Sequence, residues 1–149
     1  MASDPVMTIP QVEAFLDKVF PELLIHGRIY TVTALVPHGA TVRMAYHPSQ
    51  LRPGGTISGP AIMGLADLAL FVALLGAIGP VDQAVTSNLN ITFLRRPQPE
   101  ALLAECRLFR VGRRLASGDV ALRSENSDAI VAHATATYAI PEREQNAVS

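Results

Sequence analysis

The sequence predicts an α+β fold in which a curved antiparallel sheet wraps around a long central helix. Residues 59–79 are apolar on every side of a helix and carry one charge, Asp67, so this helix is expected to be buried all round. Six strand-like segments flank it, and the short turns between successive strands favour antiparallel pairing. The chain has 149 residues, the length of one domain, which we place at 1–149 with its core at about 10–141.

The first element is an amphipathic helix, predicted over residues 10–24. Pro10 suits the first turn, where its missing N–H would have no partner, and Pro21 weakens the last turn. The apolar residues recur at spacings of three and four, which places them on one helix face. They are Val12, Phe15, Leu16, Val19, Phe20 and Leu23.

Two paired strands follow, over residues 28–36 and 40–47. Both segments are rich in Val, Thr, Tyr and Ile, which favour strands. The residues between them, Pro37-His38-Gly39, have the composition of a tight turn. We therefore expect a hairpin here.

A loop rich in proline and glycine, residues 47–58, leads into the long helix. Ser58 or Gly59 is the expected N-cap, and Pro60 belongs to the first turn. The helix is expected to end at Gly79, which Pro80 follows.

Four further strands complete the predicted sheet, at residues 84–94, 102–111, 115–124 and 130–140. In the first of them Leu89, Ile91 and Phe93 alternate with polar residues, as a strand with one covered face requires. A sheet wrapped around a single helix leaves a sheet edge or a rim of the helix open. Such an opening favours association of two copies.

The charge and cysteine content exclude several functional classes. The formal net charge is −1 and the pI is about 6.4, which gives no basic surface for nucleic acid or an anionic membrane. The single cysteine, Cys106, cannot form an internal disulfide, and residues 1–5 lack the basic start of a secretory signal. We therefore expect a cytoplasmic protein, with a polar, frayed tail at 142–149.

Residues 59–79 are also long enough to cross a bilayer, so a membrane-spanning protein is an outlying alternative. Asp67 at mid-span would cost about 2.5–3.5 kcal/mol on insertion scales. No Lys or Arg follows Gly79 immediately to set a topology, and the strands need something to cover them. These observations favour a buried helix and no membrane partner.

Asp67 is the candidate for chemistry, because a buried carboxylate must be paired, protonated, solvated in a cleft or used. The purely structural alternative is a carboxylate that accepts hydrogen bonds from a strand backbone. The loop before the helix favours a functional role, because Gly54, Gly55 and Gly59 allow a ligand to approach and the free N–H groups of the helix start attract anions. Asp67 lies about 12 Å along the axis from Gly59. One small carbonyl group therefore reaches both only with a bend or a second chain.

A family signature is visible in residues 52–67, which read Arg-Pro-Gly-Gly-Thr-Ile-Ser-Gly-Pro-Ala-Ile-Met-Gly-Leu-Ala-Asp. This segment resembles the signature of PaaI-like (phenylacetic acid degradation type) acyl-CoA thioesterases, which have the hotdog fold. Gly55, Gly59, Leu65 and Asp67 fall in register with that signature. The resemblance continues through residues 86–97, Gly112-Arg113 and residues 130–138, and covers roughly 51 to 141 in a consistent order.

The resemblance implies a role for each matching residue. The N–H of Gly59 would hold the thioester oxygen, a donor typically worth about 3–4 kcal/mol in acyl transfer. Asp67 would be the general base for water or the nucleophile, Thr86 would orient the water or the carboxylate, and Gly55 would contact the substrate. The resemblance also implies an acyl-CoA substrate, no cofactor beyond the coenzyme A of that substrate, and a homodimer that forms the active site within a tetramer.

Two positions depart from the family signature. Arg52 stands where the family has Asn, and Ser58 where it has His. Ser58 can cap the helix and donate a hydrogen bond, whereas Arg52 can hold the thioester oxygen or a carboxylated acyl group, or can pair with an acid. The departures keep a second function open, that of a non-catalytic protein that binds acyl-CoA or another small ligand.

Two arginine pairs, Arg95 with Arg96 and Arg113 with Arg114, flank successive turns. In an antiparallel sheet these turns could converge on the phosphates of coenzyme A, and the alternative is a solvated rim. The four histidines show no metal-ligand spacing, so no metal is expected.

Overall fold

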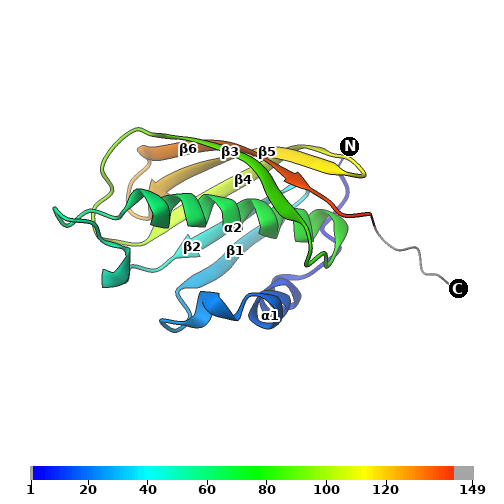
Figure 1. The fold of residues 1–149 in the computed structure, drawn as a ribbon, viewed down its shortest axis with the longest axis horizontal. Helices are drawn as coiled ribbons and strands as arrows, with labels where there is room; N and C mark the ends of the chain where they lie inside the picture. The colour runs from blue at the N-terminus through cyan, green and yellow to red at the C-terminus, as the bar shows by residue number, and fades with distance from the viewer. Residues whose placement is uncertain (1, 143–149) are drawn as a thin grey trace, which may run out of the picture.

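The computed structural model describes residues 2–142, so most of the tail that we expect to fray, residues 143–149, lies outside the described residues. The elements follow the predicted order of helix, two strands, long helix and four strands (Figure 1). They are α1 (Ile9–Val19), η1 (Pro21–Leu24), β1 (Tyr30–Val36), β2 (Gly39–Met44), η2 (Pro48–Gln50), α2 (Gly59–Ile78), β3 (Val85–Phe93), β4 (Leu102–Val111), β5 (Leu115–Ser124) and β6 (Ile130–Ala139).

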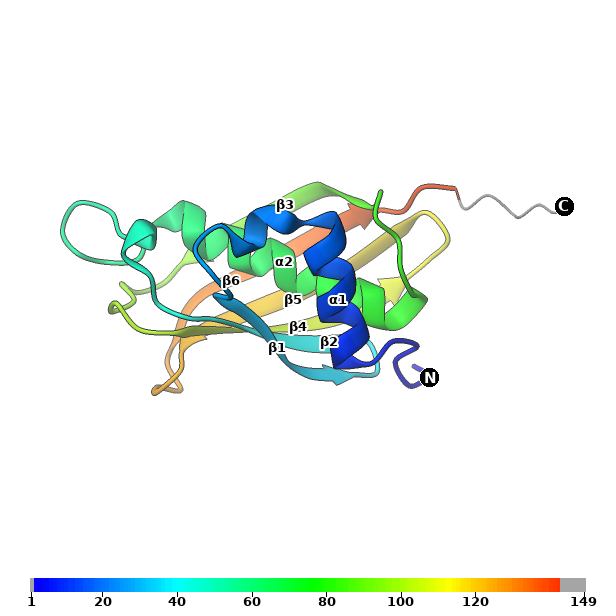
Figure 2. The same cartoon turned by 90° about the horizontal axis from the view of Figure 1, so that it is seen from below.

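The six strands form one antiparallel sheet in the order β1-β2-β4-β5-β6-β3. After β2 the chain leaves the sheet, forms α2, and returns at the opposite edge as β3. α2 lies across one face of the sheet, and α1 lies beside α2 over β1 (Figure 1, Figure 2). The predicted α+β fold, an antiparallel sheet packed around a central helix, is confirmed.

α2 begins and ends close to the predicted positions. Ser58 is the N-cap, and its Oγ accepts a hydrogen bond from the N–H of Ala61 at 3.2 Å. Gly79 ends the helix with φ of +92°, a conformation that favours glycine. The helix is long and apolar enough to cross a membrane, with a mean hydropathy of 2.3, but 67% of that window is buried inside the fold. Such burial is typical of the core helix of a soluble protein.

We expected α2 to be buried on every side, and this prediction is wrong for one face of the helix. Pro60, Met63 and Gly64 are exposed, and Asp67 is half-buried. These four residues, which we call the open stripe, follow the spacing of three and four that places residues on one helix face. The sheet does not wrap far enough to cover them.

Within residues 2–142, β3 is an edge strand that pairs with β6 alone. Leu89 and Ile91 pack partly against the core, as their alternation predicts. Phe93 is 48% exposed, so its predicted place on a covered face is wrong. Val85 and Leu94 are also exposed, which leaves apolar side chains along the free edge.

The predicted first helix is two elements in the structure. Thr8 and Gln11 form a capping box, which starts α1 at Ile9 with Pro10 in its first turn. Pro21 has no N–H to continue the α-helical hydrogen bonds, so residues 21–24 form a separate 3₁₀ turn, η1.

The strand boundaries agree closely with the sequence pattern, and β4 and β5 match to the residue. β1 starts at Tyr30 rather than at residue 28, and β2 ends at Met44 rather than at residue 47. β4 carries a bulge between Leu108 and Arg110, opposite Gly118 of β5. A Cβ at Gly118 would collide with the main-chain oxygen of Arg107, so only glycine fits opposite this bulge.

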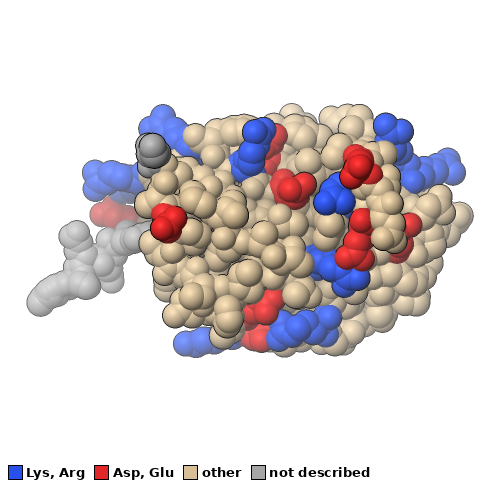
Figure 3. All heavy atoms as spheres, turned by 180° about the vertical axis from the view of Figure 1, so that it is seen from behind, with Lys and Arg blue, Asp and Glu red and all other residues tan. Residues whose placement is uncertain are grey.

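The face of the molecule turned away from the viewer of Figure 1 carries acidic and basic side chains interspersed, without a large area of one sign (Figure 3). Ion pairs cross the sheet: Arg107 of β4 pairs with Asp119 of the neighbouring β5 at 3.5 Å, and Arg43 of β2 reaches past β4 to Glu125 at the end of β5 at 2.7 Å. Pairs with at least one solvent-exposed partner typically add about 0–1 kcal/mol each, so the apolar core rather than these pairs stabilises the sheet.

Candidate active site

Asp67 sits in the middle of α2 and accepts two side-chain hydrogen bonds on the same oxygen. Thr86 Oγ1 donates to Asp67 Oδ1 at 2.6 Å, and the hydroxyl of Tyr138 donates to Oδ1 at 2.7 Å. The Tyr138 hydroxyl also lies 3.3 Å from the main-chain oxygen of Asp67. Within residues 2–142 no donor reaches the other carboxylate oxygen, Oδ2.

The two donors come from neighbouring strands at the free edge of the sheet. Thr86 of β3 and Tyr138 of β6 are directly opposed partners in the antiparallel register. β3 has a bulge just after this pair, between Thr86 and Asn88, and bulges of this kind re-aim side chains next to functional sites. The cross-strand pair therefore presents two hydroxyls together to one point on α2.

The surroundings of Tyr138 hold its ring in place. The ring stacks on Phe71, one helical turn after Asp67, with centroids 5.9 Å apart and planes 20° apart. Tyr138 is 5% exposed, and this burial, together with the nearby charge of Asp67, raises the pKa of its phenol. The hydroxyl therefore keeps its proton, and its capacity to donate, well beyond neutral pH.

Asp67 lines an open cleft of about 660 Å³. Thr86 and Gly64 lie beside it, and Asp82 adds a second carboxylate to the lining. The remaining lining is mostly apolar and includes Phe20, Leu23, Tyr30, Leu68, Phe71 and Tyr138. A cleft of this volume with few polar groups is typical of a small-molecule site.

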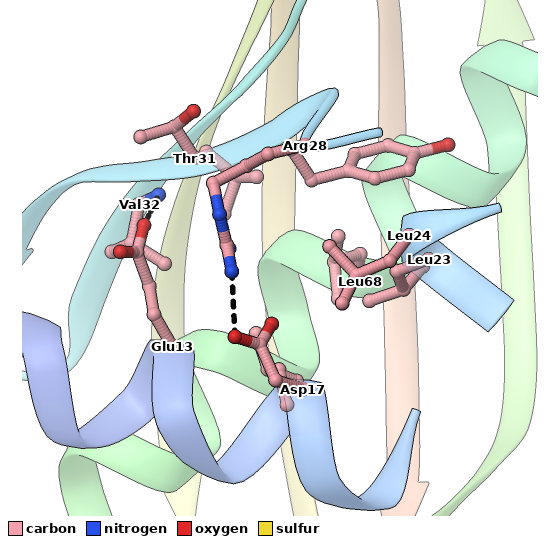
Figure 4. A pocket seen from close by; sticks show the side chains of 11 residues that line it. Glu13, Asp17, Leu23, Leu24, Arg28, Thr31, Val32 and Leu68 are labelled. Carbon is pink, nitrogen blue, oxygen red and sulfur yellow. Dashed lines mark hydrogen bonds and ion pairs between the residues drawn. The ribbon is translucent and has the colours of Figure 1, made fainter. Parts of the chain in front are cut away.

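One wall of the cleft comes from the end of α1 and from η1, and polar contacts tie this wall to β1. Arg28 pairs with Asp17 of α1 at 2.6 Å, as the dashed line in Figure 4 shows; the pocket drawn there is a smaller one between α1, η1 and β1, next to the cleft that Asp67 lines. Glu13 accepts a hydrogen bond at 2.8 Å from the main-chain N–H of Val32, an edge-strand donor. Because both contacts bridge α1 and the β1 region, they fix the wall that faces Asp67 and cover part of the β1 edge.

The start of α2 presents one free backbone donor. Pro60 has no N–H and the N–H of Ala61 donates to Ser58 Oγ, whereas the N–H of Gly59 has no partner among the described residues. The ring of Phe93 lies close by, 3.4 Å from where a Cβ of Gly59 would be. Gly59 therefore offers a single N–H to a ligand at the positive end of a long helix.

The loop before the helix is held by its own backbone hydrogen bonds. The N–H of Arg52 donates to Thr56 O at 2.9 Å, and the N–H of Gly55 donates to Arg52 O at 3.0 Å. Gly55 has φ of +82°, which a side chain would disfavour. Arg52 is exposed, and its guanidinium forms no ion pair within the described part of the chain, so no acid blocks it there.

The structure keeps Gly59 and Asp67 apart, as their spacing predicts, and it separates the two arginine pairs that we expected to converge. Gly59 and Asp67 lie at the start and the middle of the same helix, so one chain does not present both to one small group. Arg95 and Arg96 precede β4, whereas Arg113 and Arg114 follow it, so the two pairs lie about 30 Å apart at opposite ends of a ten-residue strand. Convergence of the four arginines within one chain is therefore wrong.

Two of these arginines have partners within the described structure. Arg114 pairs with Glu142 at 2.6 Å, and Arg95 Nε donates to the main-chain oxygen of Ile130 at 3.1 Å. Arg96 and Arg113 are exposed and form no ion pair within residues 2–142. Between residues 2 and 142, no group of three His, Cys, Asp or Glu side chains has the arrangement of a metal site.

Asp67 does not have the contacts of the structural alternative. Its Oδ1 accepts from two side-chain hydroxyls rather than from a strand backbone, and the residue lines a cleft rather than a sealed core. Sequence reasoning singled out Asp67 and Thr86 but missed Tyr138. The sequence does show Tyr138 as a tyrosine on a strand otherwise rich in alanine and threonine. The residues next to it in sequence, however, do not indicate which distant residue its hydroxyl contacts.

Comparison with known proteins decides the family. The model of a family described as "Thioesterase superfamily" matches residues 54–131, more than half of the chain. The chain belongs to the thioesterase superfamily. Its fold is the hotdog fold, a long central helix packed against a six-stranded antiparallel sheet, as the family resemblance implied.

Solved structures of similar proteins agree with this assignment. A "putative thioesterase" from a Silicibacter species is 36% identical to this superfamily member, over 95% of this chain and 96% of that chain, with a TM-score of 0.84. The phenylacetic acid degradation protein PaaI from Thermus thermophilus, in the structure of a mutant form, is 26% identical over 81% and 99% of the two chains, with a TM-score of 0.69.

The likeness to a more distant protein is evidence for the fold alone. Zebrafish thioesterase superfamily member 2 is 19% identical over 91% of this chain and 99% of that chain, with a TM-score of 0.78. No curated protein matches the sequence of this superfamily member.

Proposed function

We propose that this protein hydrolyses acyl-CoA thioesters to a free acid and coenzyme A, as a PaaI-like member of the thioesterase superfamily. The observation that carries the proposal is the state of Asp67, a carboxylate within an apolar helix. One of its oxygens is held by two hydroxyls, and the residue lines a cleft. Membership of the superfamily supports a thioester as the bond that is cleaved.

Two routes of hydrolysis use this carboxylate. As a general base, Asp67 takes a proton from water while the water oxygen attacks the thioester carbon, the C–S bond breaks, and the coenzyme A thiolate leaves and is then protonated. As a nucleophile, a carboxylate oxygen attacks the same carbon and expels the thiolate, and water then cleaves the mixed anhydride. Both routes place negative charge on the carbonyl oxygen, which the free N–H of Gly59 would stabilise.

The two groups meet at one carbonyl if a second copy supplies Gly59, so we propose that a homodimer forms the active site. The open stripe of α2 and the free edge of β3 support this arrangement, because both expose apolar side chains between the start of α2 and Asp67. We extend the assembly to a tetramer, a dimer of dimers, on the family resemblance.

A dimer also gives the separated arginines a common role. Antiparallel pairing of two β3 edges would bring Arg95 and Arg96 of one copy to the end of the other copy that carries Arg113 and Arg114. We propose that these side chains bind the phosphates of coenzyme A, while the acyl group enters the apolar cleft beside Asp67.

The remaining proposed contacts lie at the helix start. We propose that Ser58 donates its hydroxyl proton to the substrate while its oxygen caps the helix, and that Arg52 and Gly55 contact the substrate from the loop. We also propose a cytoplasmic location without nucleic-acid or membrane partners, which is in keeping with the net charge of −1 and the buried helix.

Purified protein assayed against short, medium and aromatic acyl-CoAs, with the released thiol as the readout, tests the function. Cys106 will not interfere with a thiol reagent, because it is 3% exposed and burial raises its pKa to about 12. We expect turnover of at least one acyl class. Replacement of the family Asn and His by Arg52 and Ser58 favours one alternative, a binding protein, and tight binding without product release over hours would support it.

A further inference from the structure

Tyr138 is a residue that neither the family resemblance nor the motif analysis assigns, yet it touches the proposed catalytic carboxylate. Its hydroxyl donates to Asp67 Oδ1 at 2.7 Å, beside the 2.6 Å contact from Thr86. We infer that Tyr138 is a positioning residue that, with Thr86, holds Oδ1 so that Oδ2 is the oxygen that acts on the thioester. This inference rests on the proposed function.

The contacts of the two carboxylate oxygens indicate that Oδ1 is held in place and that Oδ2 is the oxygen that reacts. A carboxylate sealed in the core would need donors on both oxygens, because an unpartnered buried oxygen is costly. Here Oδ1 accepts two hydrogen bonds from side chains, and Oδ2 has no donor within residues 2–142. Asp67 is half-buried and lines the cleft, so its free oxygen is open to water or substrate.

The anchor is more rigid than an isolated hydrogen bond. The two donors are opposed residues of paired strands, so the sheet fixes the distance between them. Stacking on Phe71 fixes the Tyr138 ring against the same helix that carries Asp67. The carboxylate group is therefore held at one torsion angle about its Cβ–Cγ bond, so the direction in which Oδ2 points is set before a substrate binds.

Both routes of hydrolysis require this orientation. As general base, Oδ2 would take the proton of the attacking water, and as nucleophile, Oδ2 would form the new bond to the acyl carbon. A carboxylate that rotates freely would present its oxygen in the right direction for part of the time only. The loss of one anchor should therefore lower the turnover number kcat and leave binding of the substrate unchanged.

Tyr138→Phe tests the inference, because it removes the hydroxyl and keeps the ring that stacks on Phe71. Tyr46→Phe is the matched control, since Tyr46 is 39% exposed and does not line the cleft. We expect Tyr138→Phe to lower kcat by about 10- to 100-fold with KM within about twofold, because hydrogen bonds to ionised groups are the strong ones. Tyr46→Phe should behave as wild type.

Thr86 provides a second test of the same oxygen. Thr86→Val removes the other donor at constant shape and should also lower kcat, whereas Thr86→Ser keeps the hydroxyl and should restore it. Even if Tyr138→Phe does not fold, this pair of variants tests the premise that Oδ1 must be held, and wild-type kcat in Thr86→Val would overturn it.

The possible failures are distinguishable. Wild-type kcat in Tyr138→Phe, or a loss confined to KM, would overturn the positioning role if Asp67→Asn is inactive in the same assay. Full activity of Asp67→Asn, or no hydrolysis of any thioester by the wild type, would overturn the proposed function and this inference together.

Discussion

Replacement of Asp67 by Asn and by Ala separates the chemical role of this residue from its structural role. Asn keeps an acceptor oxygen that can take the place of Oδ1, and the hydroxyls of Thr86 and Tyr138 select that orientation because an amide nitrogen cannot accept their protons. The amide nitrogen then occupies the place of Oδ2, where it can neither take a proton from water nor attack a thioester. Ala removes both oxygens.

The expected stability difference follows from the two donors. In Asp67→Ala the buried Tyr138 hydroxyl loses its 2.7 Å acceptor, which typically costs about 1–3 kcal/mol. The main-chain oxygen at 3.3 Å compensates in part, and the Thr86 hydroxyl can bond to water in the open cleft. We therefore expect Asp67→Ala to be about 1–2 kcal/mol less stable than Asp67→Asn.

Urea unfolding at neutral pH measures this difference, and thermal unfolding should show a corresponding shift of about 2–4 °C per kcal/mol. Acyl-CoA hydrolysis measured on the same samples should fall at least about 100-fold in both variants. Equal stability of the two variants would contradict the anchoring of Oδ1. Turnover by Asp67→Asn at a rate near that of the wild type would contradict the role of the carboxylate in catalysis.

Three other predictions test the fold, the buried phenol and the proposed phosphate contacts. Gly118→Ala should lower the free energy of unfolding by about 1–3 kcal/mol, because a Cβ would collide with the main-chain oxygen of Arg107; denaturation by urea measures it, and an unchanged midpoint would argue against the packed bulge. The raised pKa of Tyr138 means that the folded protein holds its phenolic proton more tightly than the unfolded chain does. Stability should therefore fall as the pH rises above about 10, and less steeply in Tyr138→Phe; unfolding curves from pH 8 to 11 that are parallel for the two proteins would refute this. Arg113→Glu should raise KM for acyl-CoA but not for a short thioester that lacks the coenzyme A phosphates, and equal effects on both substrates would remove the phosphate role.

The local pattern of the sequence was sufficient for the elements. Helix and strand boundaries depend on periodicity, caps and turn residues within a few positions, and α2, β4 and β5 lie where these signals place them. One error has a local cause, because Pro21 interrupts a helix whose apolar face continues beyond it. The other does not: Phe93 fits the alternation, but β3 lies at the edge of the sheet, where Phe93 stays 48% exposed.

The candidate site could be predicted only in part. The sequence identifies Asp67 as a candidate, because it is the one charged residue in an apolar helix and its burial would cost free energy unless the carboxylate is paired or solvated. Its partners are not visible, since Thr86 and Tyr138 are 19 and 71 positions away and meet Asp67 only because β3 pairs with β6 in one register. The arginine pairs show the same limit, because their places depend on the order of strands rather than on their spacing along the chain.

Composition and pattern by themselves determined that this protein has an α+β fold, a largely buried central helix, and one carboxylate within that helix that requires a polar partner, solvent or a ligand. Tertiary structure decided that β3 joins the sheet at the far edge. It also decided that, among residues 2–142, nothing covers the open stripe of α2 and only one oxygen of Asp67 accepts hydrogen bonds. The physical reason is that helix and strand signals arise between residues close in sequence. The contacts that shape the site join residues far apart in sequence, and only the packed sheet and helix bring them together.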